Sequence, residues 1–450
     1  MKKILSISLF LTVALISLTL TSCGETEPSQ KKNYPTKELN VYNWGEYISD
    51  EDDPECGLID VNAAFEEYFN DNLADKYGYY VKVNYSTYAT NEDMYAKITN
   101  SAVAYDIIIP SDYMIQKMIS NDLLLEIDTS RLSNYANINE DFKGLYYDTE
   151  NKYSIPYTYG MLGVIYNTEF VSDEDVKDES WGLLWNEKYK GKILQFNNPR
   201  DAFGTAMYWK NLDINSSDPA VWSQALDWLK LQKPLLQGYV NDEIFNKMKG
   251  ASAYIAPYFA GDFLTMAAEN ESLRFYYPDE GTNYFVDAMC IPKTSKNTDL
   301  AHEYIDYMIS VEAATANALY IGYASPNKAV TDSDYYRDML SYNYDTDEIS
   351  AWEVLYGEDK DTANVNYSYN PAYMDFYADE SVDIQAHVNS LWEELKTENS
   401  TELWVHITSI TIVVGVIAMA TYNIYIKKKR SRDYRTRDKL ISKEKKQHNT

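Results

Sequence analysis

The sequence predicts an α/β fold made of two sets of helices and strands, followed by one C-terminal transmembrane helix. Short apolar or alternating runs typical of strands take turns along the chain with segments whose apolar residues recur at helical spacing. That alternation is typical of a parallel or mixed sheet covered by helices. A long extended run at 153–167 follows the first set and would carry the chain into a second domain. The 450 residues suffice for two or three domains.

In the first set, three expected strands each lead into an expected helix. Gly45 breaks the first strand, and Pro110 halts the third. Asn91 is expected to cap the helix after the second strand, because two acidic residues follow it in the first turn. The expected elements are a strand at 39–44, a helix at 58–74, a strand at 79–88, a helix from Asn91, a strand at 105–109 and a helix from Ser111.

The second set ends with a strand that would lead the chain back to the first domain. Residues 331–370 are acidic, rich in tyrosine and weakly patterned, so they are expected to form a surface insertion of unassigned structure. A last helix would place Val388, Leu391, Trp392 and Leu395 on one apolar face. The expected elements are a strand at 191–196, a turn at 198–201, helices at 202–211 and 221–231, strands at 251–259 and 284–291, a helix at 299–320, a turn at 321–327 and the closing helix at 382–395.

Residues 1–22 are expected to be a lipoprotein signal peptide. Two lysines precede an apolar run, which ends in the sequence Leu-Thr-Ser directly before Cys23. This ending resembles the bacterial lipobox, in which cleavage precedes a cysteine that then receives lipid, so Cys23 is the expected lipidation site. The alternative is a signal anchor that stays uncleaved. Residues 23–37 are expected to form a flexible tether, because they are polar.

Residues 403–426 are expected to form the transmembrane helix. They contain no aspartate, glutamate, lysine or arginine and would span about 36 Å as a helix, enough to cross a bilayer with some tilt. A basic tail at 427–450 follows at once, so the tail is expected in the cytoplasm and the body outside. The alternative is a helix buried within the domain. Lipid and helix would together tie the body to the outer face of the cell membrane.

The composition is strongly acidic, with a net charge of −29 despite the basic tail. Such a chain would repel the phosphates of nucleic acid, so no nucleic-acid partner is expected, and it would attract cations. The alternative is that the charge serves solubility alone. The three cysteines form no CxxC pair, so neither a disulfide scaffold nor a zinc site is expected. Cys290 lies in an apolar strand and is expected to be buried and not paired with Cys56.

One short stretch gives the first indication of a ligand. Trp44, Glu46 and Tyr47 stand at the expected carboxyl end of the first strand, where ligands bind in open α/β sheets. A carboxylate between two aromatic rings suits an organic cation, because the carboxylate pairs the charge while the ring faces attract ammonium and methylene groups. The alternative is an edge strand with ordinary surface aromatics.

Six groups of residues within 39–327 form a recognisable pattern. They are Val41-Tyr-Asn-Trp-Gly-Glu-Tyr47, Tyr85-Ser-Thr-Tyr88 with Asn91-Glu-Asp-Met-Tyr-Ala-Lys97, Ile109-Pro-Ser-Asp-Tyr113, Ser154-Ile-Pro-Tyr157, Val286-Asp287 before Ile291-Pro292, and Ile321-Gly-Tyr323 with Pro326-Asn327. These groups resemble the spermidine/putrescine-binding proteins of bacterial polyamine ABC transporters, and the second group is the most specific. The resemblance extends more loosely to the last helix.

The resemblance implies a two-lobed, periplasmic-binding-protein-like fold of type II, whose lobes close on a ligand by a hinge. Lobe 1 would comprise 38–158 and 288–326, and lobe 2 would comprise 159–287 and 327–398. The protein would be a monomer that binds putrescine or spermidine outside the membrane and delivers it to the permease subunits of an ABC importer. The resemblance implies no cofactor, no metal and no catalytic residue.

The resemblance also implies which side chains bind the polyamine. Glu46 would accept hydrogen bonds from one amine, and Asp287 would pair the inner ammonium between aromatic rings. One position departs from the family, which has two acidic residues three apart where this chain has Asn198 and Asp201. Asn198 neutralises no charge, so the site would favour a diamine, or a longer polyamine whose far end stays wet. The full expected set is Trp44, Glu46, Tyr47, Ser111, Tyr113, Asn198, Asp201, Phe259, Phe285, Asp287 and Tyr323.

Other classes of function compete with this hypothesis. Each of these aromatic residues, taken singly, is more often part of a core than of a ligand box. A glycoside hydrolase would also use carboxylates and rings, yet His302-Glu303 lacks a second histidine four residues on, and the sequence has no GxSxG or Walker motif. The remaining class is a sensor or adhesin held by the C-terminal helix, and any signal would need a partner because the tail is short and polar. Neighbouring genes for an ATPase and two permeases would separate transport from sensing.

Overall fold

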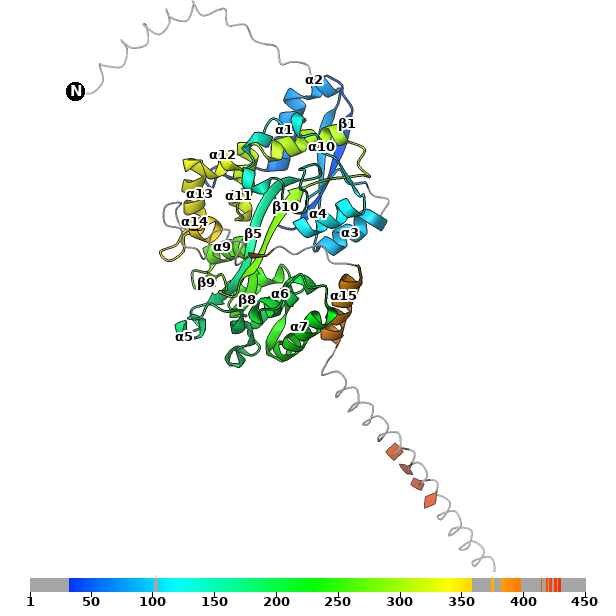
Figure 1. Cartoon of the computed structure of the whole chain (residues 1–450), viewed down its shortest axis with the longest axis vertical. Helices are drawn as coiled ribbons and strands as arrows, with labels where there is room; N and C mark the ends of the chain where they lie inside the picture. Colours follow the sequence, from blue (N-terminus) through cyan, green and yellow to red (C-terminus); the bar gives the residue numbers. More distant parts are fainter. Residues whose placement is uncertain are drawn as a thin grey trace, which may run out of the picture.

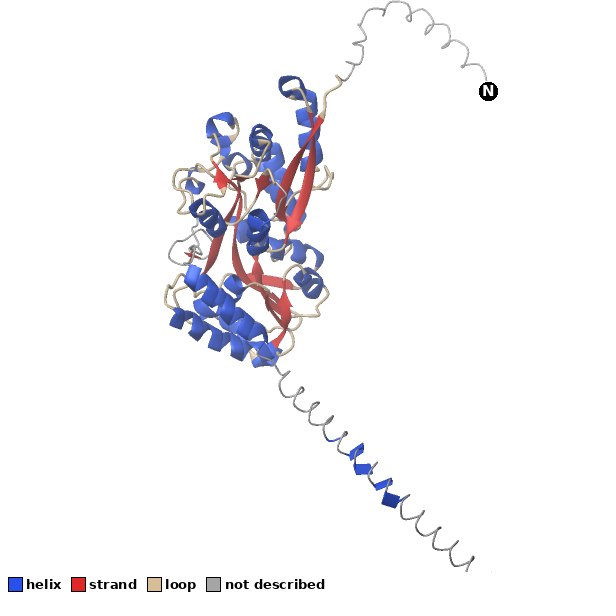
Figure 2. Ribbon diagram, turned by 90° about the vertical axis from the view of Figure 1, so that its right-hand side faces the viewer, coloured by secondary structure: helices blue, strands red, loops and turns tan. Residues whose placement is uncertain are grey.

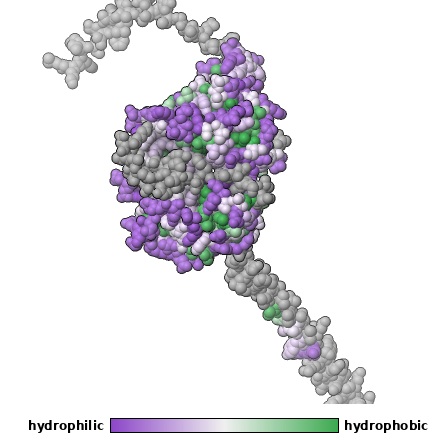
Figure 3. Space-filling model, in the orientation of Figure 1, coloured by the Kyte–Doolittle hydropathy of each residue, from purple (hydrophilic) through white to green (hydrophobic). Residues whose placement is uncertain are grey.

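The protein consists of two lobes connected by long strands, as a computed structural model of the chain shows (Figure 1). The structure describes residues 32–100, 104–357, 374–375 and 382–397, with scattered residues between 414 and 429. Strands gather in two groups, and helices cover them on the outside (Figure 2). The face seen in Figure 1 is mostly polar, with smaller apolar patches on both lobes (Figure 3). This is the two-part α/β arrangement that the sequence predicts.

The first lobe is built on a three-stranded parallel sheet in the order β2–β1–β3. The central strand ends at Trp44, directly before the glycine that was expected to break it. The strands are β1 (Thr36–Trp44), β2 (Tyr80–Tyr88) and β3 (Ile107–Ile108), and a small pair is formed by β4 (Leu124–Leu125) and β11 (Ile291–Pro292). The helices grouped around this sheet are α1 (Val61–Asn72), α2 (Ala74–Tyr77), α3 (Asn91–Asn100), α4 (Asp112–Ser120), α10 (Thr298–Met308), α11 (Val311–Ile321) and α12 (Lys328–Thr331).

The second lobe is built on a mixed sheet of seven strands within the described residues. Its strands are β5 (Ile155–Asn167), β6 (Ile193–Phe196), β7 (Leu236–Val240), β8 (Ile255–Phe259), β9 (Leu273–Tyr276), β10 (Thr282–Met289) and β12 (Met374–Asp375). The accompanying helices are α5 (Asp173–Val176), α6 (Pro199–Trp209), α7 (Pro219–Gln232), α8 (Glu243–Lys249), α9 (Ala260–Glu269), α13 (Asp334–Tyr344), α14 (Ala351–Tyr356) and α15 (Val382–Thr397). Short 3-10 turns are η1 (Thr129–Arg131), η2 (Tyr135–Asn137), η3 (Glu140–Phe142), η4 (Trp181–Trp185), η5 (Glu187–Tyr189) and η6 (Lys233–Leu235).

Two antiparallel strands, β5 and β10, connect the lobes. They lie side by side with Phe285 opposite Gly160, and a bulge interrupts the pairing after Asp287. Directly after β10, Cys290 forms an antiparallel β-bridge with Ile108 of the first sheet. The extended run predicted at 153–167 therefore does carry the chain from one lobe to the other, and the strand predicted at 284–291 leads it back. The lobe boundaries expected at 158/159, 287/288 and 326/327 stay predictions.

Three expected elements differ in detail from the structure. The helix expected at 299–320 is two helices, because Ser310 interrupts it and caps α11 by accepting a hydrogen bond from Ala313 N. The cap of α3 is Thr90, whose hydroxyl accepts from Asp93 N at 3.1 Å, so the prediction of Asn91 as the cap was wrong. The turn expected at 198–201 is the first turn of α6, with Asn198 as its N-cap.

The segment expected as a surface insertion without assigned structure is partly helical and partly buried. Tyr336 and Leu340 on α13 and Leu355 on α14 are buried, and Tyr336 shares a hydrogen bond with Tyr356 at 2.9 Å. The helix α13 packs against both α9 and α11. The buried side chains, and not the acidic residues between them, decide the position of this segment. Residues 358–370 of the predicted insertion lie outside the described residues.

Several predictions concern the two ends of the chain. Among the described residues, none of the helices has the length and apolar character needed to cross a membrane. The predicted spanning segment 403–426 and the tail 427–450 lie mostly outside those residues, as do the signal peptide, Cys23 and most of the tether. The apolar face predicted for the closing helix is confirmed, since α15 buries Val388, Leu391, Trp392 and Leu395. Cys56 and Cys290 are both free thiols, and Cys290 is buried, as predicted.

Candidate functional site

A cleft between the lobes brings together the side chains that the sequence singled out. It holds about 1120 Å³ of empty space, counting the part open to solvent. Seven carboxylates and one basic side chain, Arg200, line it among the described residues. All eleven expected residues lie on its walls: Trp44, Glu46, Tyr47, Ser111, Tyr113, Asn198, Asp201, Phe259, Phe285, Asp287 and Tyr323.

Five of the carboxylates stand where a helix begins at the cleft. A helix N-terminus carries partial positive charge and by itself attracts anions. A carboxylate in the first turn or at the cap reverses that preference, so these helix ends favour a cation. The five are Glu92 on α3, Asp112 on α4, Asp201 on α6, Asp242 at the N-cap of α8 and Asp262 on α9.

Aromatic rings line the middle of the cleft. The ring centre of Tyr323 lies 5.3 Å from that of Tyr47 and 6.0 Å from that of Phe285. Phe259 extends the row, with its ring centre 5.4 Å from Phe285. Gly160 on β5 makes room for the ring of Phe285, because a Cβ at this position would lie 2.8 Å from Cζ of Phe285. The rings offer faces and edges against which methylene groups can pack.

Asp287 lies at the centre of the cleft on β10. Its Oδ2 accepts a hydrogen bond from the Tyr47 hydroxyl at 2.6 Å, while Oδ1 is buried and has no hydrogen-bond partner among the described residues. Burial raises the pKa of Asp287 to about 6, although the nearby hydroxyls of Ser111 and Tyr47 oppose the rise. A buried acceptor without a partner is costly, so Oδ1 is a place where a cationic donor would be stabilised.

Asp112 fixes the strand that carries Asp287. Its Oδ2 accepts from Val286 N at 3.1 Å, and its Oδ1 accepts from Tyr113 N at 2.6 Å. Burial raises the pKa of Asp112 to about 8. The Asp112 carboxyl therefore connects α4 of the first lobe to β10 next to Asp287. It fixes the position of Asp287 relative to the ring of Tyr113.

One end of the cleft, here called the α6 end, is formed by Asn91, Glu92, Tyr113, Arg200 and Asp201. Asn91 Nδ2 donates to the Tyr113 hydroxyl at 3.0 Å, and that hydroxyl donates to Glu92 Oε1 at 3.2 Å. The guanidinium carbon of Arg200 lies 3.9 Å from the centre of the Tyr113 ring. Burial raises the pKa of Asp201 to about 6, and Arg200 opposes the rise.

Asn198 and Ser111 also belong to this end, and both are engaged with neighbouring side chains. Asn198 Oδ1 accepts from Asp201 N at 2.8 Å, and its Nδ2 donates to Asp201 Oδ2 at 2.9 Å. Ser111 Oγ accepts from Asn91 Nδ2 at 3.1 Å. The amide of Asn198 thus supports Asp201 and caps α6.

The opposite end of the cleft, here called the α8 end, is formed by Glu46, Asp242 and Asp262. Asp262 Oδ2 accepts from the Tyr323 hydroxyl at 2.9 Å, and burial raises the pKa of Asp262 to about 7, with Asp242 adding to the rise. Burial also raises the pKa of Asp242. Glu46 is exposed at the mouth and has a left-handed backbone, with φ of 49°. The neighbouring Trp44 ring packs on Tyr88, with centres 4.6 Å apart.

Six of the cleft residues described above were missed from the sequence as site residues: Asn91, Glu92, Asp112, Arg200, Asp242 and Asp262. Each follows closely after a strand and lies at the beginning of a helix. The rule that ligands bind at the carboxyl ends of strands was applied to the strands ending at Trp44 and Ile108, but it holds for β2, β6, β7 and β8 as well. Applied to every strand, it would have found the other five, whereas Asp112 follows β3 and was passed over between Ser111 and Tyr113.

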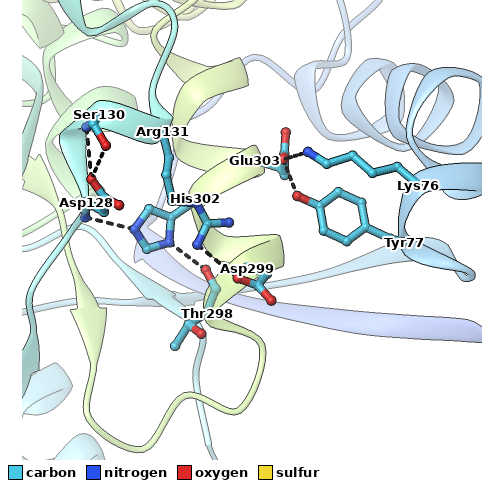
Figure 4. Close-up of polar contacts among 9 residues, drawn as sticks. All are labelled: Lys76, Tyr77, Asp128, Ser130, Arg131, Thr298, Asp299, His302 and Glu303. Carbon is cyan, nitrogen blue, oxygen red and sulfur yellow. Dashed lines mark hydrogen bonds and ion pairs between the residues drawn. The ribbon is translucent and has the colours of Figure 1, made fainter.

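The His302-Glu303 pair, weighed for a zinc enzyme, holds loops in place (Figure 4). His302 Nε2 accepts from Asp128 N at 3.0 Å, and its Nδ1 lies 2.7 Å from Thr298 O. Glu303 pairs with Lys76 at 3.1 Å. Both ring nitrogens of the histidine are therefore used within the fold. In the described part of the chain, no cluster of three or more His, Cys, Asp or Glu side chains is placed to hold a metal ion.

Known proteins share this sequence pattern and this fold. Residues 104–349, more than half of the chain, match the family of bacterial extracellular solute-binding proteins. The chain is 30% identical over 292 residues to the spermidine/putrescine-binding periplasmic protein of Escherichia coli, covering 65% of this chain and 78% of that protein. It is 29% identical over 323 residues to spermidine/putrescine-binding periplasmic protein 1 of Haemophilus influenzae, covering 70% and 84%.

A solved structure supports the same assignment. The spermidine/putrescine ABC transporter substrate-binding protein of Streptococcus pneumoniae superposes with a TM-score of 0.60 at 31% identity, covering 80% of this chain and 98% of that one. The two-lobed fold expected from the sequence is confirmed by this likeness. On its sequence match, its fold and the cleft between its lobes, the chain belongs to the bacterial extracellular solute-binding protein family.

Proposed function

We propose that the protein captures a polyamine outside the cell membrane and presents it to the permease of an ABC importer. The observation that carries this proposal is the convergence of seven carboxylates and a row of aromatic rings on one cleft between two lobes. Carboxylates pair ammonium groups and rings pack on methylenes, so the cleft suits a flexible aliphatic chain with separated positive charges. The names of the relatives in Escherichia coli and Haemophilus influenzae agree with that chemistry.

The ligand would lie along the row of rings. One ammonium would pair with Asp287, whose Oδ1 has no other partner among the described residues. The methylenes would pack between Phe259 and Phe285, and a second ammonium would reach a carboxylate at one end of the cleft. Asn198 offers no charge, which favours putrescine, or a longer polyamine whose far end stays in water.

The protein would work close to the membrane. The expected lipid on Cys23 and the expected helix at 403–426 would hold the two lobes at the outer face, with the basic tail inside. Removing residues 403–450 is expected to lower polyamine uptake by restoring free diffusion of the lipid-anchored lobes. Uptake of labelled putrescine into cells that carry the full-length or the shortened chain checks this, and unchanged uptake at equal protein level would contradict it.

Titration calorimetry on the full-length protein tests the proposed function most simply. We expect saturable binding of putrescine, spermidine or spermine and no binding of a neutral sugar. Binding of the sugar alone, or hydrolysis of a glycoside by the purified protein, would overturn the proposal.

A further inference from the structure

Arg200 is an unusual residue for its position in the fold. It stands in the first turn of α6, where the helix dipole disfavours a positive charge. Its guanidinium reaches across the cleft and lies 3.9 Å above the ring of Tyr113, which belongs to α4 of the other lobe. It is the single basic side chain among the described residues that line the cleft. The placement therefore needs a reason other than helix stability.

The surroundings of Arg200 are those that a polyamine ammonium would seek. The face of Tyr113 is a cation-binding surface, and carboxylates stand nearby on Asp112, Asp201 and Glu92. The positive charge of Arg200 opposes the rise in pKa that burial causes in both Asp112 and Asp201. A guanidinium stays charged at every physiological pH and stacks well on aromatic rings. Arg200 thus already supplies at the α6 end the charge that a ligand would otherwise bring.

The other end of the cleft has no such occupant. At the α8 end, Asp242 lies close enough to Asp262 to add to the rise in the pKa of Asp262. The described lining residues at this end include no basic side chain. A dication with one charge at Asp287 and one at this end would meet carboxylates that accept hydrogen bonds from tyrosine hydroxyls but face no basic side chain among the described lining residues. A third charge extending to the α6 end would meet the guanidinium instead.

We propose that Arg200 is a specificity-determining residue: a cation belonging to the protein that closes the α6 end of the cleft and so selects a diamine over a longer triamine. The inference rests on the proposed function and names the ligand length that the same site prefers. It differs from the effect of Asn198, which removes a negative charge, because Arg200 adds a positive charge and also fills the space over Tyr113.

The test compares putrescine and spermidine by titration calorimetry on the full-length protein and its Arg200→Gln variant. We expect the substitution to raise spermidine affinity relative to putrescine affinity by about tenfold or more. Arg200→Lys keeps the charge but loses the planar stack on Tyr113, so it is expected to raise the ratio less than Arg200→Gln does. The matched control is Arg337→Gln, because Arg337 stacks on Trp352 at 4.0 Å in the same way but does not line the cleft.

The possible results separate this inference from the proposed function. A rise in the spermidine-to-putrescine ratio in Arg200→Gln alone supports the inference. An unchanged ratio, with putrescine still bound, overturns the inference and leaves polyamine binding intact. An equal rise in Arg337→Gln also overturns it, because net charge would then be the cause. An original protein that binds neither polyamine would overturn both. Thermal unfolding of each variant confirms that the protein titrated is folded.

Discussion

The two ends of the cleft carry carboxylates in similar number but differ in what already faces them. At the α6 end, Arg200 lies over Tyr113, and the amide of Asn198 donates to Asp201 at 2.9 Å. At the α8 end, a tyrosine hydroxyl donates to Asp262 at 2.9 Å, and the described lining residues include no base. The number of carboxylates in a cleft therefore does not give the number of charges that a ligand must bring. What matters is which carboxylates the protein has already neutralised.

The largest effect is expected from Asp287, which lies between the two ends. Asp287→Asn should weaken putrescine binding at least tenfold, about 1.4 kcal/mol, because a buried ammonium would lose its charged partner. Calorimetry on the full-length protein measures this. Asp227→Asn on the exposed face of α7 is the matched control, because it removes the same charge outside the cleft. Unchanged affinity in Asp287→Asn would remove this residue from the site.

The next effect concerns pH. Burial raises the pKa of Asp112 to about 8, of Asp262 to about 7 and of Asp287 and Asp201 to about 6. The empty folded protein therefore keeps protons that the unfolded chain has lost, so its stability should fall as pH rises from about 4 to 8. A bound polyamine favours the ionised carboxylates, so binding should release protons and strengthen with rising pH.

The binding part of this prediction is measured directly. We expect putrescine affinity to rise about fivefold between pH 5.5 and pH 7.5, which corresponds to release of about a third of a proton on average over that range. Calorimetry in two buffers with different heats of ionisation gives the number of protons. An affinity that does not change over this range, with no proton released, would show that the cleft carboxylates are ionised before the ligand arrives.

The smallest expected effects on putrescine affinity compare the α8 end and the α6 end of the cleft. Asp262→Asn at the α8 end should weaken putrescine binding about threefold, because a ligand ammonium would lose a charged partner there. Asp201→Asn at the α6 end should change it less than about twofold, because Arg200 and Asn198 already face that carboxylate. Calorimetry on the two variants compares them directly. A larger loss in Asp201→Asn than in Asp262→Asn would reverse the assignment of the ends.

Much of the fold could be predicted from the sequence, because hydrophobic periodicity and strand-breaking residues determine secondary structure locally. Gly45 and Pro110 marked two strand ends, and the apolar face of α15 was visible from its spacing. The break in the helix expected at 299–320 was missed because one serine, Ser310, decides it. The packing of α13 was missed because its buried tyrosines resemble surface tyrosines in sequence, and only contacts with α9 and α11 distinguish them.

The candidate site was predicted where residue type and family pattern agree. Asp287 stood out because a charge within an apolar strand needs a partner. Asp242 and Asp262 did not, because an acid at a helix start has an ordinary explanation in the helix dipole. Arg200 could not be predicted as a site residue for a different reason. Its role depends on a ring from the other lobe, nearly ninety positions earlier in the chain, and no local pattern reports that contact.

A crystal structure of the protein with putrescine would test the account most directly. The account predicts one ammonium at Oδ1 of Asp287, the other among the carboxylates of the α8 end, methylenes against Phe259 and Phe285, and Arg200 still stacked on Tyr113. A diamine bound outside the cleft, or an ammonium on Tyr113 with Arg200 displaced, would contradict it.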